Sequence, residues 1–274
     1  MSTTERKVSA RVFTGGTGEA REETVVVEEP LAIRISGETV AVTMRTPGAD
    51  RDLVLGFLLA EGMIASAADV ASLAHCGKLG DEGRENTMEV VLAPGVKPPV
   101  DAETGMLARR GTIVSSACGV CGRVAIDDLV QRMPPLAGAA RVAASAVSAA
   151  MRALRDRQPV FAKTGGCHAA SLVTFEGEVV ATAEDVGRHN AVDKVVGARM
   201  RAGALPLAAH VLLVSGRASF EIVQKAWAAG VPVVASVSAP SSLAVELATR
   251  AGVTLVGFVR EDRLTVYAGE AVGE

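Results

Sequence analysis

The strongest constraint on the fold is an alternation of short apolar runs with helical stretches that begins near Arg141 and continues to the C-terminus. Strand-then-helix units lie at residues 209–214 with 219–229 and at 233–237 with 243–250, and strands follow at 254–259 and 264–267. This alternation is typical of βαβ units, in which a helix connects parallel strands. We therefore expect an α/β unit with a largely parallel sheet in this part of the chain.

The N-terminal part of the chain has a different pattern, with several β-rich runs in close succession. We expect strands at 24–28, 31–36 and 39–45, the last two joined as a hairpin through Gly37, then a helix at 51–61 capped by Asp50 and a strand at 86–93. Further elements are a helix at 143–155, a hairpin of 168–175 with 178–183, and a helix at 187–200. The predicted organisation is a flexible arm (1–23), a β-rich subdomain (24–115), a linker (116–135) and an α/β subdomain (136–274).

Composition excludes several classes of partner. The 28 Lys and Arg nearly balance the 31 Asp and Glu, so no basic field exists for nucleic acid. One Trp, one Tyr and six Phe are too few for a row of base-stacking rings. The longest apolar runs are shorter than the ~20 residues that cross a bilayer. Four cysteines without a leader segment do not suggest a secreted disulfide framework. We expect a cytoplasmic protein with reduced thiols.

The linker carries two cysteines, Cys118 and Cys121, with a glycine after each. This spacing suits half of a zinc site, a redox pair, or a reactive thiol on a glycine-rich loop that carries a persulfide. Two inert buried cysteines are a further alternative. Arg123 favours the thiolate form that a persulfide carrier needs. The residues alone leave these alternatives open, whereas Cys76 is expected to lie in the core.

Polar residues follow three successive strands of the predicted sheet. They are Ser215 to Arg217, the serines between 238 and 242, and the charged run from Arg260 to Arg263. The carboxyl ends of parallel strands meet at one edge, where helix N-termini favour anions. Small hydroxyl residues, glycine and arginine at this edge suit a phosphate or pyrophosphate group. The pattern predicts a nucleotide-like ligand.

A second polar run contains Asp185, His189 and Asp193 at i, i+4 and i+8. On one helix these residues would share a face, and a carboxylate would orient the imidazole as a proton shuttle or ligand contact. Asp185 as a helix cap with His189 in a surface pair is an equally good interpretation. His210 is expected to be a core histidine with its hydrogen bonds satisfied, and His75 receives no role.

Five motifs together carry a resemblance to a known family: CGVCG at 118–122, TGGCH at 164–168, DVGRHNAVDK at 185–194, SGRASFE at 215–221 and SAPSSLA at 238–244. The chain resembles the FdhD family of formate dehydrogenase accessory sulfurtransferases over residues 24–267. The resemblance implies a cytidine-deaminase-like, three-layer C-terminal half and a homodimer. It also implies a cytoplasmic carrier that takes persulfide sulfur from a cysteine desulfurase. The sulfur would go to the molybdenum of bis(molybdopterin guanine dinucleotide), before that cofactor enters formate dehydrogenase.

The resemblance also assigns residues. The persulfide-bearing cysteine corresponds to Cys118, with Cys121 as its partner thiol. The guanine-dinucleotide contact corresponds to Phe258, Val259, Arg260, Glu261, Asp262 and Arg263, and the strand-end argument adds Arg217. No transfer role falls to Cys167, and no protein-bound metal is predicted.

Other functions remain open at this point. Deaminase chemistry is excluded because no histidine has Glu two residues later. A chaperone that binds the cofactor without moving sulfur is the main alternative, and a zinc-dependent regulatory module is the third.

Overall fold

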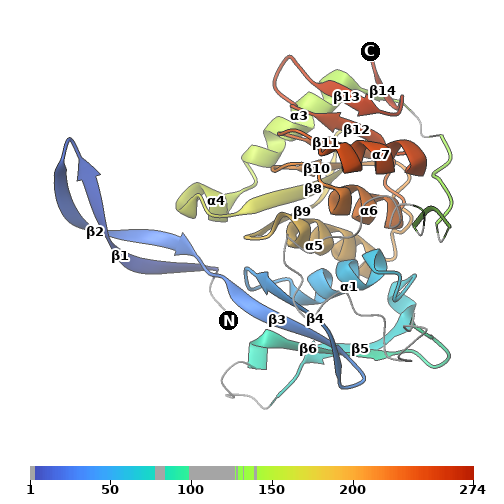
Figure 1. The fold of residues 1–274 in the computed structure, drawn as a ribbon, viewed down its shortest axis with the longest axis horizontal. Coiled ribbons are helices and arrows are strands. Elements are labelled where there is room, and N and C mark those ends of the chain that lie inside the picture. Colours follow the sequence, from blue (N-terminus) through green and yellow to red (C-terminus); the bar gives the residue numbers. More distant parts are fainter. Residues whose placement is uncertain (1–3, 78–83, 99–126, 128, 132, 139–140) are drawn as a thin grey trace.

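The computed structural model describes residues 4–77, 84–98, 127, 129–131, 133–138 and 141–274 (Figure 1). Its C-terminal half is built on a six-stranded sheet with the order β13-β12-β11-β10-β8-β9. The strands are β8 (His168–Thr174), β9 (Val179–Asp185), β10 (His210–Val214), β11 (Val233–Ser236), β12 (Thr254–Gly257) and β13 (Thr265–Ala268). The strands β10, β11 and β12 pair in parallel, whereas β8, β9 and β13 are antiparallel to their neighbours. The predicted α/β unit is confirmed, but the expectation of a largely parallel sheet is wrong, because only β10, β11 and β12 pair in parallel and the other strands pair antiparallel.

Helices cover both faces of this sheet. The helix α3 (Ala144–Arg155) lies on one face, and α5 (Arg188–Arg201), α6 (Phe220–Ala228) and α7 (Ser242–Ala251) lie on the other (Figure 1). Alternation along β10 explains how one strand serves two cores, because successive side chains point to opposite faces. Val211 and Leu213 pack in the core beneath α3, while Leu212 and Val214 pack with α5 and α6. The result is a helix–sheet–helix arrangement of three layers.

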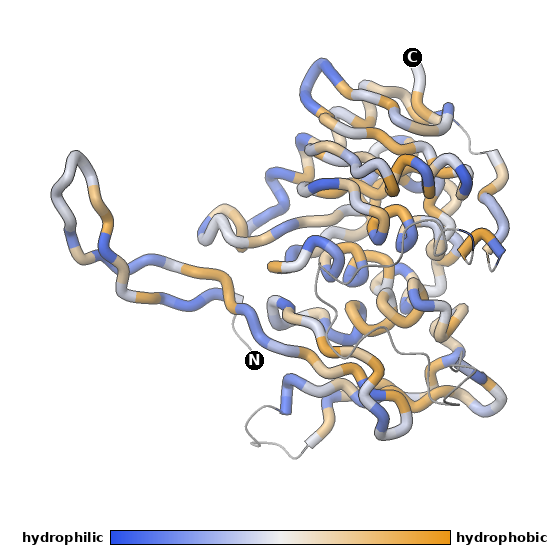
Figure 2. Tube along the Cα trace, viewed as in Figure 1, coloured by the Kyte–Doolittle hydropathy of each residue, from blue (hydrophilic) through white to orange (hydrophobic). Residues whose placement is uncertain are grey.

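The N-terminal half adds a second sheet with the order β4-β3-β6-β5. Its strands are β3 (Glu29–Ile35), β4 (Glu38–Arg45), β5 (Val70–His75) and β6 (Thr87–Leu92), and β3 and β4 form the predicted hairpin. The helix α1 (Asp50–Ala60) joins this sheet to α5, and one apolar core runs from β3 through α1 and α5 to β10. Figure 2 shows the apolar positions gathered in the body of the molecule.

The crossing of α1 and α5 is unusually close. A side chain at Gly56 would meet the backbone of Asp193, and one at Gly197 would meet the carbonyl of Asp52. Glycine in a helix interior costs roughly 1 kcal/mol relative to alanine. These two glycines are explained by the backbone contact that they permit, which fixes the position of the N-terminal half against α5.

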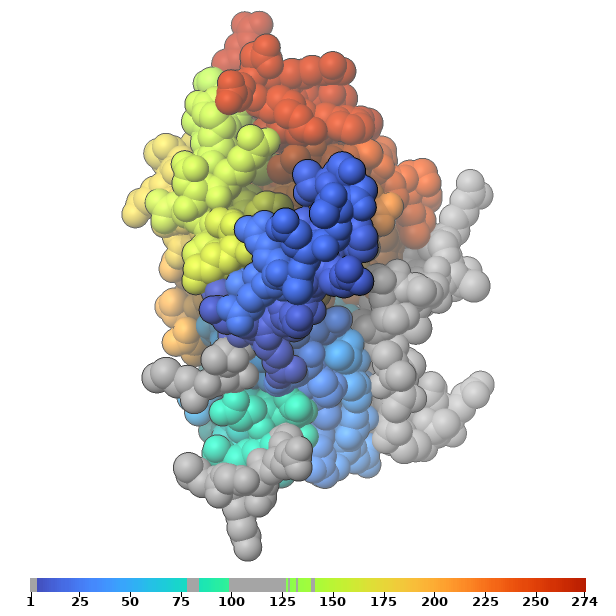
Figure 3. All heavy atoms as spheres, turned by 90° about the vertical axis from the view of Figure 1, so that its left-hand side faces the viewer, coloured from blue at the N-terminus to red at the C-terminus, as the bar shows by residue number. Residues whose placement is uncertain are grey.

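Residues 5–23 lie in regular structure except for a tight turn, so the prediction that structure starts near Thr24 is wrong. The strands β1 (Glu5–Thr14) and β2 (Thr17–Val26) pair antiparallel as a hairpin that projects from the body (Figures 1 and 3). Its cross-strand pairs are largely polar. A prediction based on apolar periodicity therefore could not identify these strands. Lys163 Nζ contacts Glu5 Oε1 at 2.9 Å and ties the base of the hairpin to α4 (Pro159–Thr164).

Two further local predictions need correction. Asp50 is not the cap of α1, because Ala49 occupies that position and the Asp50 carboxylate pairs with Arg45. The elements β5 and α4 were not expected from the sequence. Short elements also occur at η1 (Ala67–Asp69) and η2 (Arg84–Asn86), and β7 (Val142–Ala143) pairs with β14 (Val272–Gly273).

Candidate anion-binding site at the carboxyl edge of the sheet

The polar segments singled out in the sequence converge at one edge of the six-stranded sheet. The parallel strands β10, β11 and β12 all end there. The antiparallel strand β8 begins at the same edge, because Ala170 pairs with Val214 at the end of β10. The loops touch one another: Ser241 N donates to Ala218 O at 3.0 Å, and Phe258 N donates to Ser238 O at 3.2 Å. The predicted gathering of strand ends is confirmed.

The segment after β12 is held in a defined turn. Arg260 N donates to Arg263 O at 2.7 Å, and Arg260 Nη1 donates to Val237 O at 2.7 Å. Phe258 has a φ of 52° and remains 40% exposed, with its ring 6.5 Å from that of Tyr267. A non-glycine residue with positive φ is uncommon and indicates a backbone fixed by its surroundings. This segment presents an aromatic pair that the sequence argument, limited to Phe258, had missed.

A pocket of about 290 Å³ opens beside this turn, and we call it the strand-end pocket. Its lining comes from α3 and from the segment after β12: Ser148, Met151, Arg152, Arg155, Val259, Arg260, Glu261 and Asp262. Four of the six residues assigned to the guanine contact therefore line one pocket. Val259 is 1% exposed and contributes only to the wall. The two arginines of α3 were not identified from the sequence, although their helical spacing with Ser148 and Met151 could have indicated a common face.

A second pocket of about 560 Å³ lies next to the first, and we call it the helix-junction pocket. It is bounded by the end of α3, by α4, and by the start of β8, with these lining residues: Met151, Leu154, Arg155, Gln158, Phe161, Ala162, Gly165, Gly166, Cys167, His168, Ser215 and Val237. Met151 and Arg155 line both pockets. Gly166 also packs against Val26 of β2, so this pocket faces the side from which the hairpin projects (Figure 3).

The thiol and the imidazole at the start of β8 differ from free side chains. Burial, followed by the charge of Glu184, raises the pKa of the Cys167 thiol to about 11. Burial also lowers the pKa of His168, and the positive charge of Arg188 lowers it further. At neutral pH Cys167 is a protonated thiol, which is a poor nucleophile. His168 is a neutral imidazole that offers hydrogen bonds without charge.

His189 is oriented by a carboxylate, but not by either of the two that its sequence spacing suggested. Its Nδ1 lies 2.8 Å from Glu221 Oε2, and its Nε2 lies 3.0 Å from Ser219 Oγ. Burial is the main cause that lowers the pKa of His189, while the hydrogen bond to Glu221 raises it. A neutral ring in this arrangement donates from Nδ1 and accepts at Nε2. Asp185 precedes α5, so the predicted shared face holds only for His189 and Asp193, and neither predicted carboxylate orients the ring.

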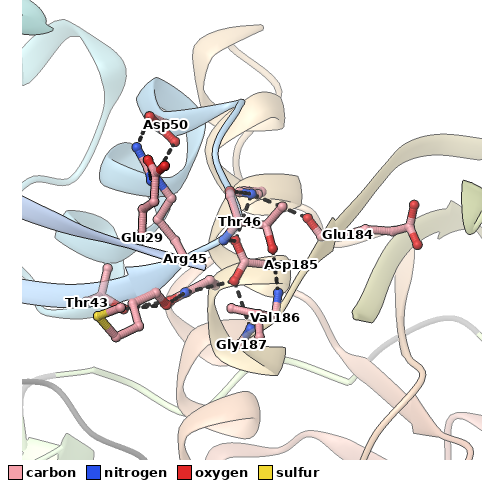
Figure 4. A network of polar contacts seen from close by, with 12 residues as sticks. Glu29, Thr43, Arg45, Thr46, Asp50, Glu184, Asp185, Val186 and Gly187 are labelled. Atoms are coloured by element: carbon pink, nitrogen blue, oxygen red, sulfur yellow. Dashed lines mark hydrogen bonds and ion pairs between the residues drawn. The ribbon is translucent and has the colours of Figure 1, made fainter. Parts of the chain in front are cut away.

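Asp185 instead joins the two halves of the molecule (Figure 4). It is fully buried at the end of β9, and Lys194 Nζ lies 2.7 Å from its Oδ2. Thr46 N donates to the same oxygen at 3.1 Å, and Gly187 N and Asn190 Nδ2 donate to Oδ1 at 2.8 and 3.0 Å. Asp185 therefore precedes α5, whose cap is Gly187, and connects the strand–helix turn to the loop after β4.

Asp193 has a third environment. Its carboxylate accepts from Lys225 Nζ at 2.7 and 2.9 Å, and burial raises its pKa to about 7. A cavity of about 30 Å³ lies beside this pair and is also lined by His189 and Glu221. The cavity is room for about one water molecule. This part of the motif therefore serves the contact between α5, α6 and α1.

The other candidate residues are placed as follows. Cys118 and Cys121 lie outside the described residues. Arg217 is exposed at the edge; burial lowers the pKa of Arg188, and the charge of Arg217 lowers it further. Cys76 is exposed, so its expected core position is wrong. His210 is half-buried, and its Nδ1 has no hydrogen-bond partner among the described residues, so the expectation of a satisfied core histidine is also wrong.

Comparison with known proteins decides the family. The protein-family model described as the FdhD/NarQ family matches residues 26–272, which is most of the chain. The chain belongs to the FdhD/NarQ family. Four of the five motifs that carried the resemblance lie at the polar edge of the sheet, next to β8, β9, β10 and β11. They are TGGCH, DVGRHNAVDK, SGRASFE and SAPSSLA.

Several curated relatives support this assignment along nearly the whole chain. A protein named sulfur carrier protein FdhD from Anaeromyxobacter dehalogenans is 58% identical over 263 residues, covering 93% of this chain and 91% of the relative. A protein of the same name from Mycobacterium tuberculosis is 51% identical over 255 residues, covering 90% of each chain.

A solved structure shows the same fold. The crystal structure of a Desulfotalea psychrophila protein, provisionally described as a formate dehydrogenase accessory protein, aligns with a TM-score of 0.77. It is 24% identical in sequence, and the alignment covers 99% of this chain and 100% of that one.

The geometry of this FdhD/NarQ protein suits binding rather than acid–base chemistry at the sheet edge. Arginines, helix N-termini and backbone donors can hold an anion, while the lowered pKa values of His168 and His189 keep these rings neutral and Asp185 is paired with Lys194. Among the helices in the described ranges, none has the length and apolar character to cross a bilayer.

Proposed function

We propose that this protein is a cytoplasmic sulfur carrier that serves formate dehydrogenase. In this proposal it accepts persulfide sulfur from a cysteine desulfurase on Cys118. It then delivers the sulfur to the molybdenum of bis(molybdopterin guanine dinucleotide). The observation that carries the proposal is membership of the FdhD/NarQ family, and the arginine-lined pocket at the sheet edge supports it. A homodimer and a relationship of the three-layer half to the cytidine deaminase fold belong to the same proposal.

The strand-end pocket supports the cofactor part of the proposal. It brings Arg152 and Arg155 of α3 to the segment that contains Arg260, Glu261 and Asp262. Arginine matches phosphate oxygens through its planar set of donors. Carboxylates accept from the N–H and amino groups of a guanine ring. A guanosine diphosphate group therefore finds complementary charges at both of its ends.

The loading step is a thiol–persulfide exchange. The Cys118 thiolate attacks the outer sulfur of the desulfurase persulfide, a new S–S bond forms on Cys118, and the desulfurase thiolate leaves. No net oxidation occurs in this step. Delivery as sulfide breaks the S–S bond and needs two electrons, which Cys121 supplies by forming a disulfide or which an external thiol reductant supplies.

Mass analysis tests the loading step. Incubation with a cysteine desulfurase and cysteine is expected to add the mass of one sulfur atom to the wild type. The C76A variant is the control: it removes an exposed thiol that is not the proposed carrier, so it should gain the sulfur as the wild type does. A C118A variant that still gains the sulfur and still supports formate dehydrogenase activity would sink the proposal. Full function of the double variant C118A/C121A would favour a chaperone that binds the cofactor without moving sulfur.

The role of Cys121 is tested separately. If Cys121 supplies the electrons, C121A loads sulfur normally but releases it only when a thiol reductant is added. If the reductant acts directly, C121A and the wild type release sulfur at the same rate.

A further inference from the structure

Helix α3 connects two pockets that differ in chemistry. Ser148, Met151, Arg152 and Arg155 recur at helical spacing on the face toward the sheet edge, and all four line the strand-end pocket. Met151 and Arg155 also line the helix-junction pocket. Arg260 reinforces the connection, because it lines the first pocket and donates to the carbonyl of Val237, which lines the second. The two pockets therefore adjoin along α3, and we call the pair the groove.

The charge of this groove changes along its length. Glu261 and Asp262 place carboxylates in the strand-end pocket, which Arg152 and Arg260 also line. Arg155 places positive charge where the two pockets adjoin. The other end is mainly apolar, with Leu154 and Ala162 in its lining and Phe161 46% exposed. The lining thus passes from acidic through basic to apolar groups. This succession matches a ligand with a hydrogen-bond donor at one end, phosphates in the middle and a flat ring at the other end.

Hydrogen-bonding groups at the apolar end are few and uncharged. His168 is neutral because burial lowers its pKa. Ser215 Oγ accepts from Ala169 N at 2.8 Å, which leaves its hydroxyl proton available. Pockets for flat organic ligands commonly combine an apolar lining with a few such groups, in volumes of roughly 300–1,000 Å³. The helix-junction pocket, at about 560 Å³, has this character.

We propose that the helix-junction pocket binds the pterin ring of a pterin–guanine dinucleotide. Its guanosine lies in the strand-end pocket, and its phosphates lie against Arg155. This inference rests on the proposed function, which supplies the dinucleotide as ligand. Phe161 contacts the face of the pterin ring, and Glu261 accepts from the guanine ring. Arg155 is the one charged residue that serves both halves of the groove.

Two probes separate the halves of the groove: GDP, and a fluorescent phosphorylated pterin such as neopterin phosphate. Both are titrated against the full chain, GDP by calorimetry and the pterin by fluorescence quenching. The wild type should bind both at the same time. Loss of one charge-assisted contact costs about tenfold in affinity. R155A should therefore bind both probes about tenfold more weakly, F161A only the pterin, and E261Q only GDP.

The matched control is R157A, which removes an exposed arginine just beyond α3 that lines neither pocket. It should bind both probes as the wild type does. The inference is overturned if the wild type does not bind the pterin, if GDP displaces it, or if E261Q rather than F161A weakens it.

Other outcomes would contradict the proposed function rather than the pterin site. If GDP fails to bind, or if C118A accepts sulfur, the cofactor or carrier proposal fails. Binding of the pterin with its dependence on Phe161 is still measured in either case.

Discussion

Glu221 Oε2 lies 2.8 Å from Nδ1 of His189, and this contact joins two sequence motifs that lie on different helices. The carboxylate comes from SGRASFE at the start of α6, and the imidazole comes from DVGRHNAVDK at the start of α5. Ser219 completes the set by contacting Nε2 of the same ring. The contact fixes the ring plane and the relative position of the two helix N-termini at the sheet edge.

The first prediction concerns the ionisation of His189. The Glu221 carboxylate raises the pKa of His189 against the effect of burial, so E221Q should lower that pKa further. Loss of one charge-assisted hydrogen bond should also lower the free energy of unfolding by about 1–2 kcal/mol. NMR titration of the histidine Cε1–H signals measures the pKa, with H189N to assign the signal. S219A, which removes no charge, is the control, and a rise of the pKa in E221Q would contradict the prediction.

The second prediction concerns the cost in stability that the buried histidines impose on mild acidification. Burial lowers the pKa of His168, His189 and His210 below the ordinary value of 6.5. As the pH falls below about 6.5, the unfolded chain binds protons at these residues before the folded chain does. The free energy of unfolding therefore decreases with falling pH. Asp193 acts in the opposite direction, because its pKa of about 7 lets the folded protein bind one proton below pH 7.

A comparison of the wild type with H210N isolates the contribution of one histidine, because Asp193 is present in both proteins. Urea unfolding from pH 7.5 to 5, followed by the fluorescence of the single tryptophan, Trp227, measures it. Trp227 is buried and donates to Pro134 O at 3.0 Å, so unfolding exposes it. The wild type should lose more unfolding free energy than H210N between pH 7.5 and 5, and an equal or smaller loss in the wild type would refute this reasoning.

The sequence predicted the order of most strands and helices and the edge at which their loops meet, because both follow from local patterns. Apolar periodicity identifies β10, β11 and β12, and their parallel pairing brings Ser215, Ser238 and Arg260 to one edge. The partners of buried charges were not predictable in this way. Asp185 binds Thr46, which is 139 residues away in the chain, and His189 binds Glu221 of another helix. Residue spacing within one motif contains no information about such contacts.

The third prediction concerns the crossing of α1 and α5. G197A would place a methyl group against the carbonyl of Asp52, and G56A would place one against the backbone of Asp193. Backbone atoms on a packed helix cannot move aside cheaply, so each variant should lose about 1–3 kcal/mol of unfolding free energy. G138A is the control, because nothing lies within 4 Å of that position. Urea unfolding measures all three, and a stable G197A would mean that the helices can separate without cost.

The fourth prediction tests the junction between the two halves at Asp185 (Figure 4). D185N keeps the shape of the side chain but removes the charge that faces the buried ammonium of Lys194, 2.7 Å away. An ammonium left buried without its counter-charge costs about 3–5 kcal/mol, so the free energy of unfolding should fall by that amount. E178Q, an exposed carboxylate before β9, should change it by less than about 0.5 kcal/mol. The double variant D185N/K194M removes both charges and should recover part of the loss, whereas a purely steric role of Asp185 would leave the double variant no more stable than D185N.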